Sequence, residues 1–183
     1  MLLATSRTLQ DFLLSRIPEG GADWIDIHSL HEDAGSNPLP VNRLVLCLYS
    51  VVPDPHLRNR PKVHTDRGFV RPPMAVLLRY LVTYNSDDHP EAQERTARVL
   101  EAFHTRPILG PPDLDPELSG LVRELSVRIL SPSMEEMNQL WTALNRPLRL
   151  SLYLEVTPAF VPNLEAEGEG PVRERELRLE TAR

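Results

Sequence analysis

The stretch that decides the fold is RLVLCLYSV, residues 43–51. Its apolar side chains occupy both alternating sets of positions, so neither side of the extended chain is consistently polar. A strand with one face in water alternates between apolar and polar residues, whereas a strand covered on both faces is a nearly continuous apolar run. Residues 43–51 therefore predict a central strand of a β-sheet, with other elements packed on both faces.

Further elements flank this strand along the chain. The apolar spacing predicts helices over residues 5–17 and 91–104, a third helix between Ser133 and Pro147, and strands over residues 24–30, 74–84, 121–130 and 149–157. Two strand–helix–strand passages occur in this order, and they favour parallel neighbours with right-handed crossovers. We therefore predict an α/β fold: a single domain with a mixed β-sheet of about five strands flanked by three helices, followed by a polar C-terminal arm.

Each expected helix presents an apolar stripe. In the first helix the stripe is formed by Leu9, Phe12, Leu13 and Ile17. In the second it is formed by Ala92, Thr96, Val99, Leu100 and Phe103. In the third it is formed by Met137, Leu140, Trp141 and Leu144. Ser133 and Glu136 are spaced as a capping box, which predicts the start of the third helix.

The composition excludes several functional classes. The chain has 183 residues with 20 basic and 26 acidic side chains, which gives a net charge of −6. Nucleic acid and anionic membranes attract proteins with surplus positive charge, so neither is expected as a partner. No apolar run approaches the roughly 20 residues of a membrane-spanning helix. Within residues 1–17, charged Arg7, Asp11 and Arg16 interrupt the apolar pattern, so this stretch is not expected to be a signal peptide. The expected location is the cytoplasm.

The composition changes after Pro162. Residues 163–183 hold six acidic residues and four arginines and have few apolar side chains. Such a segment cannot bury enough apolar surface to become ordered on its own. We therefore divide the chain into a domain, residues 1–162, and a charged C-terminal arm, residues 163–183. An extended arm can add to the edge of a neighbour's sheet, and the candidate contact residues of the arm are Val172, Leu177 and Leu179.

The sequence carries none of the usual catalytic or ligand-binding motifs. It has no glycine-rich phosphate loop, no G-x-S-x-G turn, no H-E-x-x-H helix and no paired cysteines. His28 and His31 would point to opposite faces of a strand, so we expect exposed structural histidines rather than a metal pair. The single cysteine, Cys47, lies in the apolar run and is expected to be buried. We expect no catalytic residue, no cofactor and no metal.

The connection over residues 52–73 is unusually long and basic. Its 22 residues exceed the ordinary length of a connection in a compact domain. It contains Arg58, Arg60, Lys62, Arg67 and Arg71 against only two acidic residues, Asp54 and Asp66. On a chain with negative net charge this pattern favours a docking loop for an acidic partner surface. A solvated linker without a partner is the alternative.

Five stretches of the sequence together resemble one protein family. They are LYSVVPDPHLRN (48–59), RPPM (71–74), RYLVTY (79–84), HTRPIL (104–109) and LWTALNRPLRLSL (140–152). In this order and spacing they resemble the cap, or tail-terminator, family of phage-tail-like contractile injection systems, over about residues 6–158. The resemblance implies a non-enzymatic protein that forms a six-fold ring at the baseplate-distal end of the particle. It implies three partners: further copies of the chain, the inner tube protein and the sheath protein, whose growth the ring terminates.

The residues that match the family's motifs fall into two groups. Those in apolar elements are expected in the core: Tyr49, Tyr80, Leu81, Val82, Trp141 and Leu152. Those that follow Pro53 form either a structural turn or a subunit contact: Asp54, Leu57, Arg58 and Asn59. Together with Arg60, Arg67 and Arg71, this second group makes up the candidate contacts to other subunits, sheath or tube.

Two other functions stay open at this stage. The first is a baseplate-side adaptor, which would belong to the same particle as a cap but lie at its other end. A small enzyme with a site around Asp54, Arg58 and Arg71 is the alternative from another class. Such an enzyme would need a deep pocket in which titratable groups face one another.

Overall fold

The computed structural model describes residues 1–18, 21, 23–31, 39–55, 61, 63–65, 68–70 and 75–161. The helices are α1 (Leu2–Arg16), α2 (His89–Thr105), α3 (Met134–Ala143) and a short 3-10 helix, η2 (Pro116–Leu118). The strands are β1 (Ile25–Ile27), β2 (Arg43–Pro53), β3 (Val63–Thr65), β4 (Gly68–Val70), β5 (Val76–Asn85), β6 (Ile108–Leu109), β7 (Val122–Leu130) and β8 (Ser151–Phe160). The α/β class with three α-helices is confirmed.

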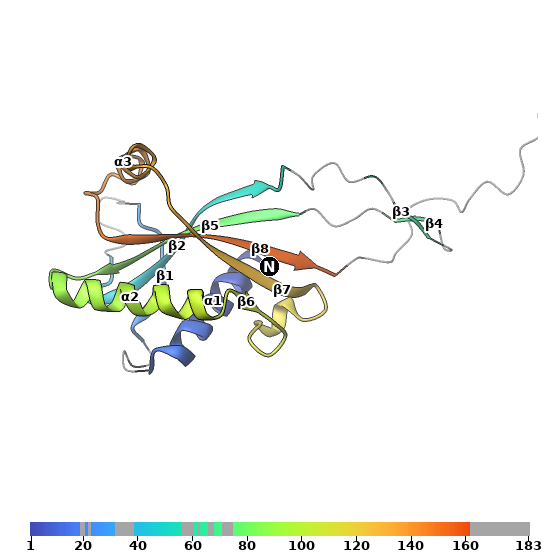
Figure 1. The fold of residues 1–183 in the computed structure, drawn as a ribbon, viewed down its shortest axis with the longest axis horizontal. Coiled ribbons are helices and arrows are strands. Elements are labelled where there is room, and N and C mark those ends of the chain that lie inside the picture. The colour runs from blue at the N-terminus through green and yellow to red at the C-terminus, as the bar shows by residue number, and fades with distance from the viewer. Residues whose placement is uncertain are drawn as a thin grey trace, which may run out of the picture.

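Six of the strands form one mixed sheet in the order β1-β2-β5-β8-β7-β6 (Figure 1). β1 pairs parallel with β2, and the other neighbours pair antiparallel. All five predicted strands are present in this sheet, and the two-residue β6 is its additional strand; β3 and β4 were not predicted either. β3 and β4 pair with each other and lie beyond the ends of β2 and β5.

The expectation of parallel neighbours across the strand–helix–strand passages is wrong. β7 and β8, which α3 connects, pair antiparallel. β5 and β7, which α2 connects, are separated by β8. The connection through α3 begins and ends at the same end of the sheet, so it is not a crossover. The position of β8 between β5 and β7 depends on pairing between strands far apart in the sequence. A helix between two strands does not predict this pairing.

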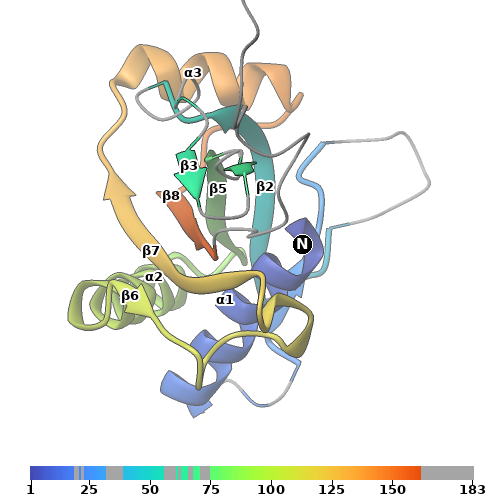
Figure 2. The same cartoon turned by 90° about the vertical axis from the view of Figure 1, so that its right-hand side faces the viewer.

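The sheet separates two apolar cores. α1 and α2 cover one face, whereas α3 covers the other (Figures 1 and 2). Leu46 of β2 belongs to the larger core, with Phe12 and Phe103 of the two helices. Val45 and Cys47 belong to the smaller core beneath α3. The prediction that residues 43–51 form a strand covered on both faces is therefore confirmed.

The helix ends follow the sequence signals closely. Ser133 Oγ accepts a hydrogen bond from the Glu136 N–H at 3.2 Å, and the Glu136 carboxylate accepts one from the Ser133 N–H at 2.7 Å. This pair is the predicted capping box. Asp88 caps α2 by accepting a hydrogen bond from the Glu91 N–H at 3.1 Å.

The predicted apolar stripes are confirmed with one exception. The four stripe residues of the first helix are buried in α1 or at its end: Leu9, Phe12, Leu13 and Ile17. Trp141 of α3 is buried, and its other three stripe residues are half-buried. In α2, Leu100 is 42% exposed although Val99 is fully buried. Neighbouring helical positions point about 100° apart, so Leu100 falls off the stripe that Val99 occupies.

Tyr80 joins α1 to the middle of the sheet. Its hydroxyl shares a hydrogen bond of 2.9 Å with Ser6 Oγ in the larger core. Burial raises the pKa of Tyr80 to about 12, so the phenol stays neutral and fixes α1 on the sheet. None of the helices in the described residues is long and apolar enough to cross a membrane.

Candidate assembly surface

The β2–β5 ladder carries the long basic connection. It runs from Arg43 opposite Asn85 to Pro53 opposite Val76. One further main-chain bond extends it, because the Asp54 N–H donates to the Ala75 carbonyl at 2.9 Å. The connection therefore leaves and returns at one end of the sheet, and the β3–β4 hairpin lies beyond that end, far from α3 (Figure 1).

Of the seven candidate contact residues near this connection, the structure describes only Asp54. The other six lie outside the described residues: Leu57, Arg58, Asn59, Arg60, Arg67 and Arg71. The same is true of the arm candidates Val172, Leu177 and Leu179. Asp54 is only 9% exposed, and this burial favours the structural turn for this residue. The contact role of the others stays a prediction.

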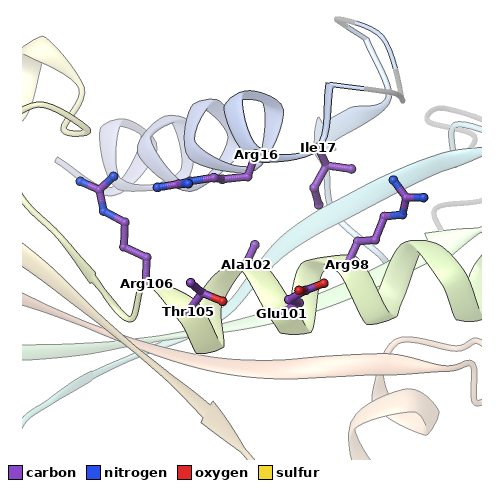
Figure 3. A pocket seen from close by; sticks show the side chains of 7 residues that line it. All are labelled: Arg16, Ile17, Arg98, Glu101, Ala102, Thr105 and Arg106. Atoms are coloured by element: carbon purple, nitrogen blue, oxygen red, sulfur yellow. The ribbon is translucent and has the colours of Figure 1, made fainter.

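A hollow of about 300 Å³ lies between the C-terminal parts of α1 and α2. Figure 3 shows the side chains that line it. Its described lining consists of Arg16, Ile17, Arg98, Glu101, Ala102, Thr105 and Arg106. Arg98 pairs with Glu94 at 2.8 Å, and Arg106 pairs with Asp113. Arg16 lies over the Phe12 ring, with 5.7 Å between the guanidinium carbon and the ring centroid. These arginines thus have partners within the chain, and no histidine or cysteine stands among the described lining residues.

A second hollow, of about 480 Å³, lies between α3 and the sheet. Behind it Glu155 of β8 is only 4% exposed and pairs with Arg79 of β5 at 3.4 Å and with Arg128 of β7. These two ion pairs link β5, β8 and β7. On the rim, hydrogen bonds from Ser133 lower the pKa of Glu136, which is the capping residue. Arg79 and Glu136 of this hollow, and Glu155 behind it, thus have structural partners.

Cys47 is a structural residue as well. Burial raises the pKa of the Cys47 thiol, so the side chain is the protonated, buried hydrophobe that the sequence predicts. No group of three or more histidine, cysteine, aspartate or glutamate residues within the described ranges could hold a metal ion.

Comparison with known families identifies the chain. A family model described as the Pvc16 N-terminal domain matches residues 4–175. The chain belongs to this family. The matched range includes all five stretches on which the resemblance in the sequence rests, so that resemblance is confirmed.

Two solved structures share the fold of this Pvc16 N-terminal domain. One is described as the PVC sheath/tube terminator in the extended state, from an extracellular contractile injection system; its TM-score is 0.59 at 17% identity, over 100% of this chain and 64% of that one. The other is described as the anti-feeding prophage cap, the AFP tube terminating cap; its TM-score is 0.59 at 20% identity, over 98% of this chain and 62% of that one. The chain thus spans less than two thirds of either protein. No curated protein sequence matches it significantly.

The motif residues of the family lie mainly in the two cores. Tyr80, Leu81, Val82 and Trp141 are at most 1% exposed. Tyr49 and Leu152 are half-buried and pack against the smaller and the larger core, respectively. The core role expected for this group is therefore confirmed.

Sequence reasoning missed a further feature, the two outer edges of the sheet. Residues 44–53 contain no charged side chain, and this was sufficient to predict burial of both faces of β2. It was not sufficient to predict whether a neighbouring strand covers the whole length of β2. The available signal is length. The strand pattern at residues 24–30 is shorter than β2, so a strand there could cover only part of β2.

Proposed function

We propose that this chain is the structural part of a cap that terminates a contractile injection particle. On this proposal it forms a six-fold ring at the baseplate-distal end, where it ends the growth of the inner tube and the outer sheath, and it catalyses no reaction. The observation that carries the proposal is the family match over residues 4–175. The fold shared with two proteins described as a sheath/tube terminator and a tube terminating cap supports it. Its partners are further copies of the chain, the tube protein and the sheath protein, and it assembles in the cytoplasm.

The two ends of the sheet differ in a way that suits a terminator. Such a protein must bind the last layer of a polymer with one surface and offer no equivalent surface to the next layer. At one end of the sheet the β2–β5 ladder ends and the basic connection leaves it, whereas α3 packs near the other end (Figure 1). We assign the end of the sheet from which the connection leaves to contacts with tube or sheath, because the excess of basic residues in the sequence of the connection complements an acidic surface.

The experiment that tests the function is end-labelling of intact particles. A gold-labelled epitope on the chain is expected at one end of each particle, opposite the baseplate. Deleting the gene is expected to give tubes and sheaths of irregular length. Label at the baseplate would favour the adaptor function instead, and particles of normal length and yield without the gene would contradict the cap.

Removing two charges from the connection gives a second test. The variant Arg58→Ala with Arg60→Ala is expected to fold normally and to weaken assembly on particle ends at low salt. Each exposed ion pair contributes about 0.2–1 kcal/mol, so the expected loss is roughly two- to thirty-fold in apparent Kd. Binding measured at several salt concentrations should show that the difference shrinks as salt screens the pairs.

The matched control removes the same charge elsewhere. Arg7 and Arg123 are exposed on α1 and β7, with side chains 44% and 74% accessible. Replacing both with alanine is expected to leave assembly unchanged. Equal weakening by the two double variants would mean that net charge matters, and that the connection has no specific role.

A further inference from the structure

A further hollow, of about 340 Å³, lies at the end of the sheet where β8 begins. Arg146 and Arg149, from the connection between α3 and β8, form part of its wall. Arg149 Nη1 donates a hydrogen bond to the side-chain oxygen of Asn85 at 2.7 Å. Asn85 is 8% exposed and donates in turn to the Pro40 carbonyl at 2.8 Å. Arg146 Nε donates to the Leu30 carbonyl at 2.8 Å. Both guanidinium groups are therefore held in place at the hollow.

These two arginines lack the carboxylate partner that most other arginines have. The described arginines that form an ion pair are Arg7, Arg43, Arg79, Arg95, Arg98, Arg106, Arg123 and Arg128. Arg146 and Arg149 are half-buried and have no such partner among the described residues. Asp87 is the one acidic residue in the described lining, so the hollow keeps a surplus of one positive charge. A carboxylate is the ligand that suits it, because two carboxylate oxygens match the forked donors of a guanidinium.

The connection between β6 and β7 offers such a carboxylate. Residues 110–121 contain three acidic side chains and no basic one. Asp113 pairs with Arg106, and Asp115 is 9% exposed and accepts a hydrogen bond from the Glu117 N–H at 2.8 Å. The side chain of Glu117, by contrast, is 60% accessible.

Glu117 keeps most of its capacity to bind a partner. Its Oε1 accepts a hydrogen bond from Arg7 at 3.2 Å, and the Arg7 side chain is itself 44% accessible. Exposed ion pairs of this kind contribute little. No described residue donates a hydrogen bond to Oε2 of Glu117. The carboxylate is therefore available to further donors.

The turn that carries Glu117 is firmly held. Glu117 lies in η2, whose last residue, Leu118, is fully buried. The Asp115 N–H donates a buried hydrogen bond to Thr8 Oγ1 of α1 at 2.9 Å. Figures 1 and 2 show this connection, in yellow, projecting on the side of α1. A carboxylate on such a turn loses little conformational freedom when it binds.

The hollow and the turn lie too far apart to meet within one copy. Arg149 is two residues before Ser151, where β8 begins, and β8 ends at Phe160 opposite Val122, where β7 begins after the turn. The ten residues of β8 span about 33 Å at the usual rise of a strand. In Figure 1 the start of β8 and the yellow connection accordingly lie at different ends of the sheet. The two complementary surfaces can meet only between copies.

We propose that copies of this chain join head to tail, with Glu117 of one copy bound by Arg146 and Arg149 of the next. The contact uses two different surfaces of the chain, so its repetition around an axis closes a ring. The turn lies on the side of α1, apart from the β3–β4 hairpin (Figure 1), which leaves the basic connection to tube or sheath. This inference rests on the ring of the proposed function and names its interface.

Reversing the two charges separately and then together tests the contact. Arg149→Glu alone and Glu117→Arg alone place like charges at every junction, so each is expected to raise the concentration for half-maximal ring formation at least tenfold. Mixed in equal amounts, the two variants are expected to form rings within twofold of the parent concentration. Every junction of an alternating ring then joins opposite charges, and a six-membered ring can alternate. Sedimentation, with and without particle ends, measures ring formation.

The control reverses an exposed carboxylate elsewhere. Glu101→Arg, on α2, should form rings like the parent and should not bring a fluorescently labelled Arg149→Glu chain into them. Thermal midpoints check the fold of each variant, and Glu117→Arg is expected to keep the parent midpoint because its side chain is exposed. This variant therefore tests the contact even if Arg149→Glu disturbs the bond to Asn85.

The outcomes separate this contact from the cap itself. Parent rings that tolerate Glu117→Arg would overturn the contact alone. Losses that mixing does not restore would also overturn it, because Arg149 and Glu117 would then serve different partners, such as Glu32 or Asp33 of the same chain for Arg149. A parent chain that forms no ring and never reaches particle ends would overturn both the contact and the cap.

Discussion

Replacing Trp141 with alanine is expected to lower the free energy of unfolding by about 3–5 kcal/mol, the usual cost of removing a buried tryptophan. Trp141 is 1% exposed and is the largest member of the smaller core. Its indole N–H donates a hydrogen bond to the Tyr153 hydroxyl at 3.1 Å. The substitution removes the main apolar contact of α3 with the sheet and also leaves a buried hydroxyl without this donor.

Urea denaturation monitored by circular dichroism measures the effect. Domains of this kind are typically stable by about 5–15 kcal/mol, so the variant should unfold at much lower urea. Met134→Ala is the matched control, because Met134 lies on the same helix and is 61% exposed; its effect should stay within about 0.5 kcal/mol. A loss below about 1 kcal/mol for Trp141→Ala would show that α3 does not depend on this core.

The parts of the fold that follow from neighbouring residues could be predicted from the sequence. The apolar run at residues 43–51 determines that β2 is covered on both faces, and Val45 and Leu46 do lie in different cores. The capping box of Ser133 and Glu136 fixes the start of α3 within one turn. In these cases the deciding interactions are made within a few residues of the chain, where the pattern is visible.

The arrangement of the strands could not be predicted in the same way. β8 is the last strand in the chain, yet it pairs with both β5 and β7. That pairing is selected by the packing of whole strand faces, including the buried Glu155 between Arg79 and Arg128. An isolated Glu155 in an apolar strand gives no indication of two arginine partners on two other strands.

The candidate contact residues could be predicted only in part, for a similar reason. The sequence gives the chemistry of the connection, an excess of basic residues on an acidic protein, but composition does not determine which of them meet a partner. The sheet edges are the opposite case: their apolar composition was visible, but the length over which a neighbouring strand covers them follows only from where β1 and β6 end. Ladder length is a property of two strands together, which no single stretch of sequence specifies.

Truncation of the charged arm, residues 163–183, is expected to leave the fold intact and to weaken attachment to the particle. The described members of both cores all precede the arm, so we expect the thermal midpoint to stay close to that of the full chain. An added strand is held mainly by main-chain hydrogen bonds, each contributing a net of about 0.5–1.5 kcal/mol. Loss of only two such bonds predicts roughly a five- to 150-fold lower affinity for particle ends.

Separating ring formation from attachment makes this last expectation more specific. We expect the arm to add its strand to a neighbouring surface of the particle and not to hold the ring together. We therefore expect truncated chains to form rings normally and to fail at the subsequent attachment, as measured by sedimentation and by binding to preformed particles. A glycine–serine segment of the same length in place of the arm is the control for tethering, and it should not restore attachment.

A triple variant tests the apolar side chains of the arm, with serine in place of Val172, Leu177 and Leu179. It should give an intermediate loss of attachment, because the main chain is retained while the apolar side chains are not. Truncated chains that attach as tightly as the full chain would exclude the arm from the interface.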